Sequence, residues 1–424
     1  MATVGPVEVL LLGTGGPRGW PEPGCACASC STAVRSRSVR APTCALVDDV
    51  LLLGGFDGVA RAAARAGRDL ARVRQVLVTA ASPDPRRWLD EVGGSSPVEV
   101  RGPAAALEGL DAERVRPVPV SPGQEHPAPG GHHVRAVQQG DALAWDVRGA
   151  AGRLLHAPGR GQLGGSPAQP PYDLVQLGLD SAAQVLAQLR RDGTAGPATQ
   201  VRAVGYDHDA ARPDVLQHHL EGWGVRGSED GDVVLLGDAG PEPSVSSTRT
   251  LVLGGVRSGK SALAEQLLAA HPHVTYVATG GTRSDDAEWQ QRVEAHRARR
   301  PASWRTVETT DLVACVRDAE GAVLVDCLGT WLTALLDQNG VWHGGPLEPV
   351  EAAVDELLVA WRATRVPLVV VSNEVGSGVV PATPSGRLFR DLLGRLNARV
   401  AAESDTVLLT VAGIPLPLRV PARS

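Results

Sequence analysis

Basic side chains other than arginine are almost absent from this sequence. Of its 424 residues Lys260 is the only lysine, and the formal net charge is −6. Because a net negative chain binds polyanions poorly, we expect no nucleic-acid partner. A flexible ammonium group fits between phosphates where a planar guanidinium does not. The one lysine of this arginine-rich sequence is therefore a candidate for binding phosphate.

Long apolar runs and an export signal are also missing. No stretch of about 18 apolar residues occurs, which argues against a membrane-spanning helix. Residues 1–13 carry no basic segment and no cleavage site, so we expect a cytoplasmic protein. The six cysteines are then not expected to pair in disulfides. With only two Phe and three Tyr, the cores must be built from Leu, Val and Ala.

The lysine lies in a phosphate-loop pattern. Residues 254–261 read GGVRSGKS, which fits G-x-x-x-x-G-K-S, between an apolar run at 250–253 and a helical run at 262–270. An ordinary strand–turn–helix junction is the alternative. In a phosphate loop, Lys260 reaches the β- and γ-phosphates of a nucleotide and Ser261 binds Mg²⁺. The backbone of the remaining loop residues is expected to surround the phosphates: Gly254, Gly255, Val256, Arg257, Ser258 and Gly259.

Strands and helices alternate after this loop, which predicts a mostly parallel sheet with ligands at the carboxyl ends of its strands. Asp326 directly follows the apolar run 322–325, at a position where a carboxylate would bind Mg²⁺ directly or through a water molecule. The alternative is an aspartate that merely ends a strand. The further expected strands are 273–278, 367–371 and 406–411, and the expected helices are 285–299, 330–336, 350–364 and 387–402.

The first half of the chain has many short strands and few helices, which favours an αβ sandwich. Residues 238–249 are rich in Pro, Ser and Gly and are interpreted as a linker between domains 1–237 and 250–424. The expected strands are 7–12, 45–53, 75–79, 115–120, 133–137, 153–155, 174–177, 201–204 and 232–236, and the expected helices are 59–66 and 181–191.

Three cysteines cluster near the N-terminus. Cys25, Cys27 and Cys30 have the spacing C-x-C-x-x-C on a short loop, where three thiolates can converge on one tetrahedral Zn²⁺. A closed structural site needs a fourth ligand. Three reduced cysteines on a surface loop are the alternative.

A set of motifs after residue 250 carries a resemblance to a known family. They are GGVRSGKSALAE at 254–265, VTYVATG at 274–280, RVEAHRARRPASWRTVE at 292–308, VDCLGTWLT at 325–333, VVSNEVGSGVVP at 370–381 and FRDLLGRLNARVA at 389–401. This segment resembles the bifunctional adenosylcobinamide kinase / adenosylcobinamide-phosphate guanylyltransferase of cobalamin biosynthesis. The resemblance implies a P-loop α/β fold and phosphorylation of adenosylcobinamide with ATP or GTP. It further implies transfer of GMP from GTP to give adenosylcobinamide-GDP, and a homo-oligomer, a trimer in that family.

The same resemblance assigns roles to single residues. His296 matches the histidine that becomes guanylylated, with arginines on both sides of it; on the bare sequence it is a surface histidine on a basic helix. Glu308, Asn373 and Glu374 are expected to contact the nucleotide or its metal, although the last two also suit a structural turn. Arg390, Asp391 and Asn397 are assigned to the site on the weakest grounds.

Residues 7–237 resemble the metallo-β-lactamase fold, in the branch of the phosphonate-pathway cyclic phosphodiesterase and the pyrroloquinoline-quinone accessory protein. The cues are LLGTGG, PEPGCACASC and RAPT leading into a strand. In that branch a late histidine completes a structural zinc site with the three cysteines, and His208 has the matching position. Where the branch has histidines for catalytic metals, this sequence has a set without imidazole: Ala80, Ser82, Pro85 and Gly205.

Three functions remain to be separated. The first is the two-step cobinamide enzyme behind a domain that has lost its catalytic metals. The second is a metal-dependent hydrolase fused to a nucleotide-binding domain, which the missing histidines oppose. The third is a nucleotide-binding scaffold without activity, in which Lys260, Asp326 and His296 coincide by chance.

Overall fold

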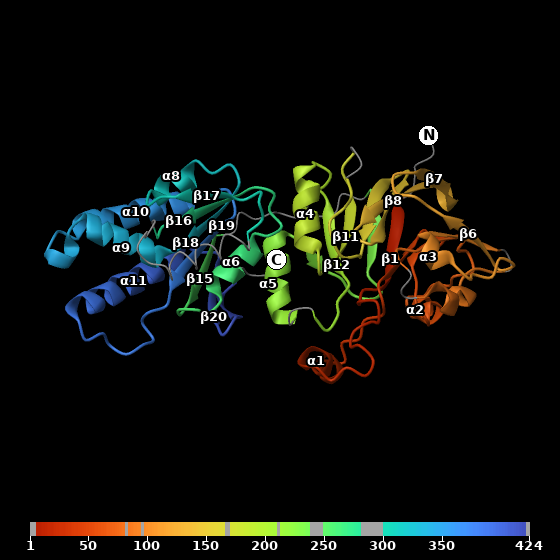
Figure 1. The fold of residues 1–424 in the computed structure, drawn as a ribbon, viewed down its shortest axis with the longest axis horizontal. Helices are drawn as coiled ribbons and strands as arrows, with labels where there is room; N and C mark the ends of the chain where they lie inside the picture. Colours follow the sequence, from red (N-terminus) through yellow and green to blue (C-terminus); the bar gives the residue numbers. More distant parts are fainter. Residues whose placement is uncertain are drawn as a thin grey trace. The chain divides into compact units, whose positions relative to one another are not determined.

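The chain forms two compact units, Met1–Ser244 and Val245–Ser424, drawn in Figure 1. The structure is a computed structural model, and it describes residues 6–80, 84–94, 97–165, 170–209, 213–237, 249–280 and 300–420. The expected helix 285–299, His296 within it, and all but the last residue of the expected linker lie outside the described residues. Unit 1 and unit 2 are described separately below.

Unit 1 contains two seven-stranded sheets. The first has the order β14-β1-β2-β3-β4-β5-β6, with strands Val233–Leu236, Val7–Gly13, Cys44–Val47, Leu51–Gly54, Gln75–Leu77, Val98–Gly102 and Val115–Pro119. The second has the order β13-β12-β11-β10-β9-β8-β7, with strands Arg226–Gly227, Gln200–Val204, Leu174–Gly178, Gly152–Ala157, Ala142–Gly149, His132–Gln139 and Glu125–Ala128.

The two sheets pack face to face. Their shared core contains Leu11 and Leu77 from the first sheet and Trp145 and Leu154 from the second. A second core covers the outer face of the first sheet and includes residues of α2 and α3, while α4 and α5 lie on the opposite side (Figure 1). The helices are α1 (Ala28–Ser36), α2 (Val59–Arg65), α3 (Ala104–Leu107), α4 (Ala182–Arg191) and α5 (Pro213–Trp223). The expected αββα sandwich is therefore confirmed.

The predictions for unit 1 were incomplete: β5, β9 and α5, among others, were not expected from the sequence, and one expected strand was wrong. The run 45–53 is not one strand but the hairpin β2–β3, in which Asp48 and Asp49 turn the chain with φ of 48° and 58°. Short polar side chains tolerate this left-handed conformation. The two aspartates were included in one strand because buried apolar residues flank them on both sides. Helix α1 was not predicted either, because its short sequence has no apolar stripe and was interpreted as a metal-binding loop.

Unit 2 is built on a seven-stranded sheet of order β17-β16-β18-β19-β15-β20-β21. All neighbouring strands are parallel except β21, which pairs with β20 in the antiparallel sense. The mostly parallel sheet predicted from the alternation of elements is confirmed. In that order the strands span Arg305–Glu308, Val274–Ala278, Ala322–Asp326, Leu368–Asn373, Arg249–Gly254, Thr406–Val411 and Ile414–Arg419.

Helices cover both faces of this sheet. Trp331, Trp361 and Leu393 are buried in the core on one face, beneath α9, α10 and α11, and Leu263 and Leu267 of α6 pack on the other. The helices are α6 (Lys260–Leu267), α8 (Leu312–Arg317), α9 (Leu328–Gln338), α10 (Glu348–Ala363) and α11 (Pro384–Glu403). Among the described helices of the chain, none is long and apolar enough to cross a membrane.

Candidate functional site

The sheet of unit 2 brings predicted site residues to one edge. Gly254 ends β15 and pairs with Asn373 at the end of β19. Ala278 at the end of β16 pairs with Asp326 of β18 and with Glu308 of β17. Because these strands are parallel, their carboxyl ends meet at the same edge, where ligands of open α/β sheets bind.

The phosphate loop leaves this edge at Gly254 and enters α6 at Lys260. Two glycines are needed there: a Cβ on Gly254 would lie 2.3 Å from Ser258 Oγ, and Gly259 has a φ of 94°. The Lys260 ammonium donates to the Gly255 carbonyl oxygen over 3.1 Å, so it lies folded back across its own loop. Backbone N–H groups and a cation at a helix N-terminus can bind an anion such as a phosphate.

Asp326 is held by a buried tyrosine. The Tyr276 hydroxyl donates a hydrogen bond of 2.9 Å to Asp326 Oδ2. Burial and the neighbouring carboxylate raise the pKa of Tyr276, so its hydroxyl keeps the proton it donates. The Arg300 guanidinium lies 3.8 Å from the centre of the Tyr276 ring, within the range of a cation–π interaction. One oxygen of Asp326 is therefore fixed in direction, and a carboxylate of this kind suits Mg²⁺.

A cleft of about 440 Å³ opens between the ends of β16 and β17 and helix α9. Its lining includes Glu308, Asp337 and five threonines: Thr279, Thr309, Thr310, Thr330 and Thr333. The hydroxyls of Thr279 and Thr330 are 2.6 Å apart, and Thr279 also donates to the Cys327 carbonyl oxygen. Hydroxyl and carboxylate groups of this kind can bind the hydroxyls of a ribose.

Asn373 and Glu374 lie beside the phosphate loop. The Glu374 backbone N–H donates to the Gly254 carbonyl oxygen over 3.1 Å. The carboxylate of Glu374 accepts from the Gly376 N–H over 2.6 Å, so it stabilises its own turn. Asn397 of α11 donates to the Asn373 carbonyl oxygen and accepts from the Ser372 hydroxyl, and so fixes the end of β19. Arg390 and Asp391 form an ion pair with each other at 2.9 Å.

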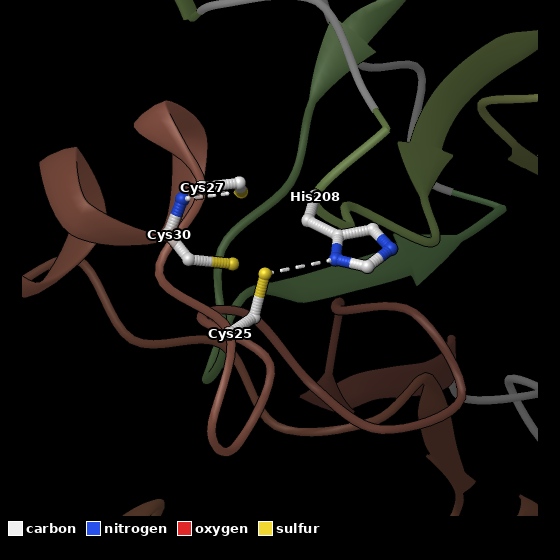
Figure 2. A group of neighbouring side chains, drawn as sticks. All are labelled: Cys25, Cys27, Cys30 and His208. Carbon is white, nitrogen blue, oxygen red and sulfur yellow. Dashed lines mark hydrogen bonds between the residues drawn. The ribbon is translucent and has the colours of Figure 1, made fainter.

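Unit 1 brings the four predicted zinc ligands together. One ligand atom from each of Cys25, Cys27, Cys30 and His208 can be chosen so that all lie within 4.8 Å of one another. Figure 2 shows the Cys25 and Cys30 sulfurs pointing toward the space in front of His208. Cys25 Sγ is 3.3 Å from His208 Nδ1, and Cys27 caps α1 by accepting the Cys30 N–H. Three sulfurs and one imidazole nitrogen at such spacing suit a tetrahedral Zn²⁺.

The local electrostatics of this cluster differ between its cysteines. The hydrogen bond from the Cys30 N–H lowers the pKa of the Cys27 thiol, which is solvent-exposed. Burial raises the pKa of Cys30 to about 11, against the effect of the Glu22 N–H that its sulfur accepts. Because Zn²⁺ binds thiolates, a metal would have to supply the charge that keeps Cys30 deprotonated.

The positions of unit 1 where the resembling branch has histidines for catalytic metals offer no such ligand set. Nearby, Asp84 pairs with Arg86 at 2.7 Å on the surface. Gly205 has a φ of 77°, and Pro85 is buried; Ser82 lies outside the described residues. The buried Gln139 amide bonds to the Gly159 backbone on both its oxygen and its nitrogen. Across the described part of the chain, the cysteine–histidine cluster is the one group of three or more such side chains that converges closely enough for a metal.

Sequence reasoning missed Tyr276 and the cleft threonines. Tyr276 lies in the apolar strand β16, where an aromatic residue suggests core packing rather than contact with Asp326, 50 positions later. Its signal was the hydroxyl itself, since a buried tyrosine usually has a hydrogen-bond partner. The threonines come from three separate segments and share no pattern in the sequence.

Comparison with known proteins agrees with this arrangement. The family model of cobinamide kinase / cobinamide phosphate guanyltransferase matches residues 250–418. The bifunctional adenosylcobalamin biosynthesis protein CobU of Salmonella typhimurium is 38% identical over 180 residues, which cover 40% of this chain and 98% of that protein. CobP of Pseudomonas aeruginosa, described by the same name, is 39% identical over 176 residues, covering 40% of this chain and 97% of its own length.

Solved structures provide a more distant comparison. Zn²⁺-bound PqqB of Methylobacterium extorquens is 15% identical with a TM-score of 0.38, covering 54% of this chain and 99% of its own. A diphosphatase of the PhnP family is also 15% identical, with a TM-score of 0.39, covering 55% and 97%. The relatives that match residues 250–418 are much closer in sequence, and through this segment the chain belongs to the cobinamide kinase / cobinamide phosphate guanyltransferase family.

Proposed function

We propose that this protein phosphorylates adenosylcobinamide with ATP or GTP and then transfers GMP from GTP to the product, giving adenosylcobinamide-GDP. The observation that carries the proposal is the convergence of the phosphate loop, Asp326 and the threonine-lined cleft at one edge of the unit 2 sheet. Identity of 37–39% to bifunctional adenosylcobalamin biosynthesis proteins over nearly their whole length supports the choice of substrate.

In the kinase step, the loop and Lys260 bind the nucleotide phosphates. The Lys260 ammonium leaves the Gly255 carbonyl oxygen for the β- and γ-phosphates and stabilises the charge that builds up as the γ-phosphoryl group moves. The Ser261 hydroxyl and the Asp326 carboxylate are oxygen donors, which fit Mg²⁺. When bound, Mg²⁺ would neutralise phosphate charge. Tyr276 restrains the Asp326 carboxylate by donating a hydrogen bond to one of its oxygens.

In the guanylyl step, the His296 imidazole attacks the α-phosphorus of GTP and pyrophosphate leaves. The phosphate of adenosylcobinamide phosphate then attacks the bound guanylyl group and frees the histidine. Dividing the transfer into two displacements lets one set of cations serve both. Glu308 and the cleft threonines are suited to binding the ribose hydroxyls during both displacements.

The test is incubation with adenosylcobinamide, Mg²⁺ and α-labelled GTP, followed by analysis of products and of labelled protein. We expect adenosylcobinamide-GDP and a covalent GMP adduct. His296→Ala should lose the adduct and keep the kinase step. Label that remains bound to this variant would reject His296 as the acceptor, and no phosphorylated corrinoid from the wild type would reject the function.

For unit 1 we propose a structural zinc held by Cys25, Cys27, Cys30 and His208, and no hydrolase activity. The support is the close approach of these four side chains and the lack of imidazole at residues 80, 85 and 205. A hydrolase screen with added Mn²⁺, Fe²⁺ or Zn²⁺ tests the second part. The family resemblance also makes a cytoplasmic homotrimer the assembly to test, by sedimentation.

A further inference from the structure

Two valines at the active edge of unit 2 are exposed. Val379 is 95% exposed and Val380 is 60% exposed, in the connection between β19 and α11. Val256, in the phosphate loop, is 76% exposed. Single exposed apolar side chains are ordinary on protein surfaces. Here they lie on two loops that leave neighbouring strands, β19 and β15, at the same edge of the sheet.

The connection that carries Val379 and Val380 is held at both ends. At its start the Glu374 N–H is bonded to the Gly254 carbonyl oxygen, and the Glu374 carboxylate closes the turn onto the Gly376 N–H. At its end Arg387 donates to the carbonyl oxygens of Pro381 and Ala382 at 3.0 and 2.8 Å. The valines are therefore presented to solvent by a connection that is anchored directly to the phosphate loop.

The position of this pair differs from that of the apolar side chains exposed on β21. Ile414, Leu416 and Leu418 are exposed on β21, the outermost strand, two strands away from β15. By contrast, Val379 is six residues beyond Asn373, which limits their separation to about 20 Å. A substrate whose reacting hydroxyl lies at the phosphate loop, and which is as large as a corrinoid, covers surface at that range.

We propose that Val379 and Val380 form an apolar platform that contacts the corrin macrocycle of the cobinamide substrate while its hydroxyl reaches the phosphate loop. This inference rests on the proposed function. The macrocycle presents methyl groups and a broad apolar face, and water leaves both surfaces when they meet. The two valines are not part of residues 254–261, the loop expected to bind the nucleotide phosphates, so the contact is assigned to the corrinoid and not to the nucleotide.

The experiment compares steady-state kinetics of the full-length wild type with the double variant Val379→Ser, Val380→Ser. We expect the KM for adenosylcobinamide to rise about tenfold, while kcat and the KM for nucleotide stay unchanged. This pattern results when a substitution weakens binding of the substrate and of the transition state equally. Val359→Ser is the matched control, since Val359 is 53% exposed on α10, and it should leave all three constants unchanged. Sedimentation of each variant is measured in parallel.

Each other outcome decides against the platform. An unchanged KM for adenosylcobinamide, or an equal rise in both KM values, would overturn it. Dissociation of an oligomer in the double variant would instead assign the valines to contact between copies of the chain, and would also overturn it. No turnover by the wild type would reject the proposed function itself, whereas wild-type turnover with an unaltered variant would reject the platform alone.

Discussion

The strand ends of the two units carry different chemistry on sheets of the same size. In unit 2 the edge presents Lys260, Asp326 and Glu308, with a cleft between the strands. In unit 1, backbone groups occupy the space at the carboxyl ends of the neighbouring parallel strands β10 and β11. A Cβ on Gly178 would lie 2.3 Å from the Pro158 carbonyl oxygen, and Gln139 occupies the polar groups of Gly159.

The fold of unit 1 is held by packing between its sheets, where the core consists of apolar side chains. Side chains on loops after the strands lie outside this core, so replacing them by alanine, proline or glycine changes the available ligand atoms without opening it. Unit 1 carries the cysteine–histidine cluster, which connects residues near the N-terminus to a loop after β12.

The largest effect is expected from the lysine of unit 2. Lys260→Ala should reduce turnover of adenosylcobinamide by about a thousandfold, because it removes the flexible cation from the phosphates. Asp84→Ala is the control in unit 1 and should stay within about twofold of the wild type. Comparable losses in both variants, at unchanged melting temperature, would contradict the division of labour between the units.

The next largest effect is expected from the loss of a zinc ligand in unit 1. Cys27→Ser should release about one equivalent of zinc per chain and lower the melting temperature of unit 1 by on the order of 10 °C. Turnover below that temperature should be unchanged. Metal analysis and calorimetry measure this, with Cys315→Ser, a half-buried thiol of unit 2, as control. Wild-type protein purified without zinc would refute the site.

Acid should weaken unit 1 through a buried histidine. His156 is fully buried with Nδ1 2.6 Å from Gln176 Oε1, and burial lowers its pKa to about 4 from an ordinary value of 6.5. Between these values the unfolded chain takes up a proton that the folded chain does not, so stability falls as the pH drops, by up to about 3 kcal/mol. Calorimetry at pH 7 and 5 should show about 2 kcal/mol of this loss, the part that falls between pH 6.5 and 5.

A variant series separates His156 from other acid effects. His156→Leu should reduce the dependence of the unit 1 melting temperature on pH, whatever its effect on stability at pH 7. His133 is an exposed histidine in the same sheet as His156. His133→Leu should leave the pH dependence of the melting temperature as in the wild type. An unaltered dependence in His156→Leu would rule out this histidine as the cause.

The smallest effect concerns the tyrosine that holds Asp326. Tyr276→Phe removes one hydrogen bond to a carboxylate and should reduce turnover about tenfold, while the Mg²⁺ concentration for half-maximal activity rises. Tyr172→Phe removes a buried tyrosine hydroxyl from unit 1 and should leave both quantities unchanged. If Tyr276→Phe and the wild type depend equally on the Mg²⁺ concentration, Tyr276 does not position Asp326 for the metal.

Some of the site could be predicted because its information is local. The loop 254–261 encodes a turn, a helix start and a cation within eight consecutive residues, and Asp326 follows directly after its strand. The contact of Tyr276 with Asp326 could not be predicted in this way. It depends on which elements become neighbours, and the periodicity of a single segment does not specify its neighbours.

By itself, the sequence determined the phosphate loop, the alternating architecture of residues 250–424 and the absence of imidazole from residues 80, 82, 85 and 205. Each of these is a property of short stretches, set by backbone conformation and side-chain chemistry. Only the tertiary structure brought His208 to Cys25 across 183 positions, fixed Asp326 through Tyr276 and left Val379 exposed on the connection between β19 and α11. These depend on the packing of distant segments, because burial and proximity are set by the whole fold.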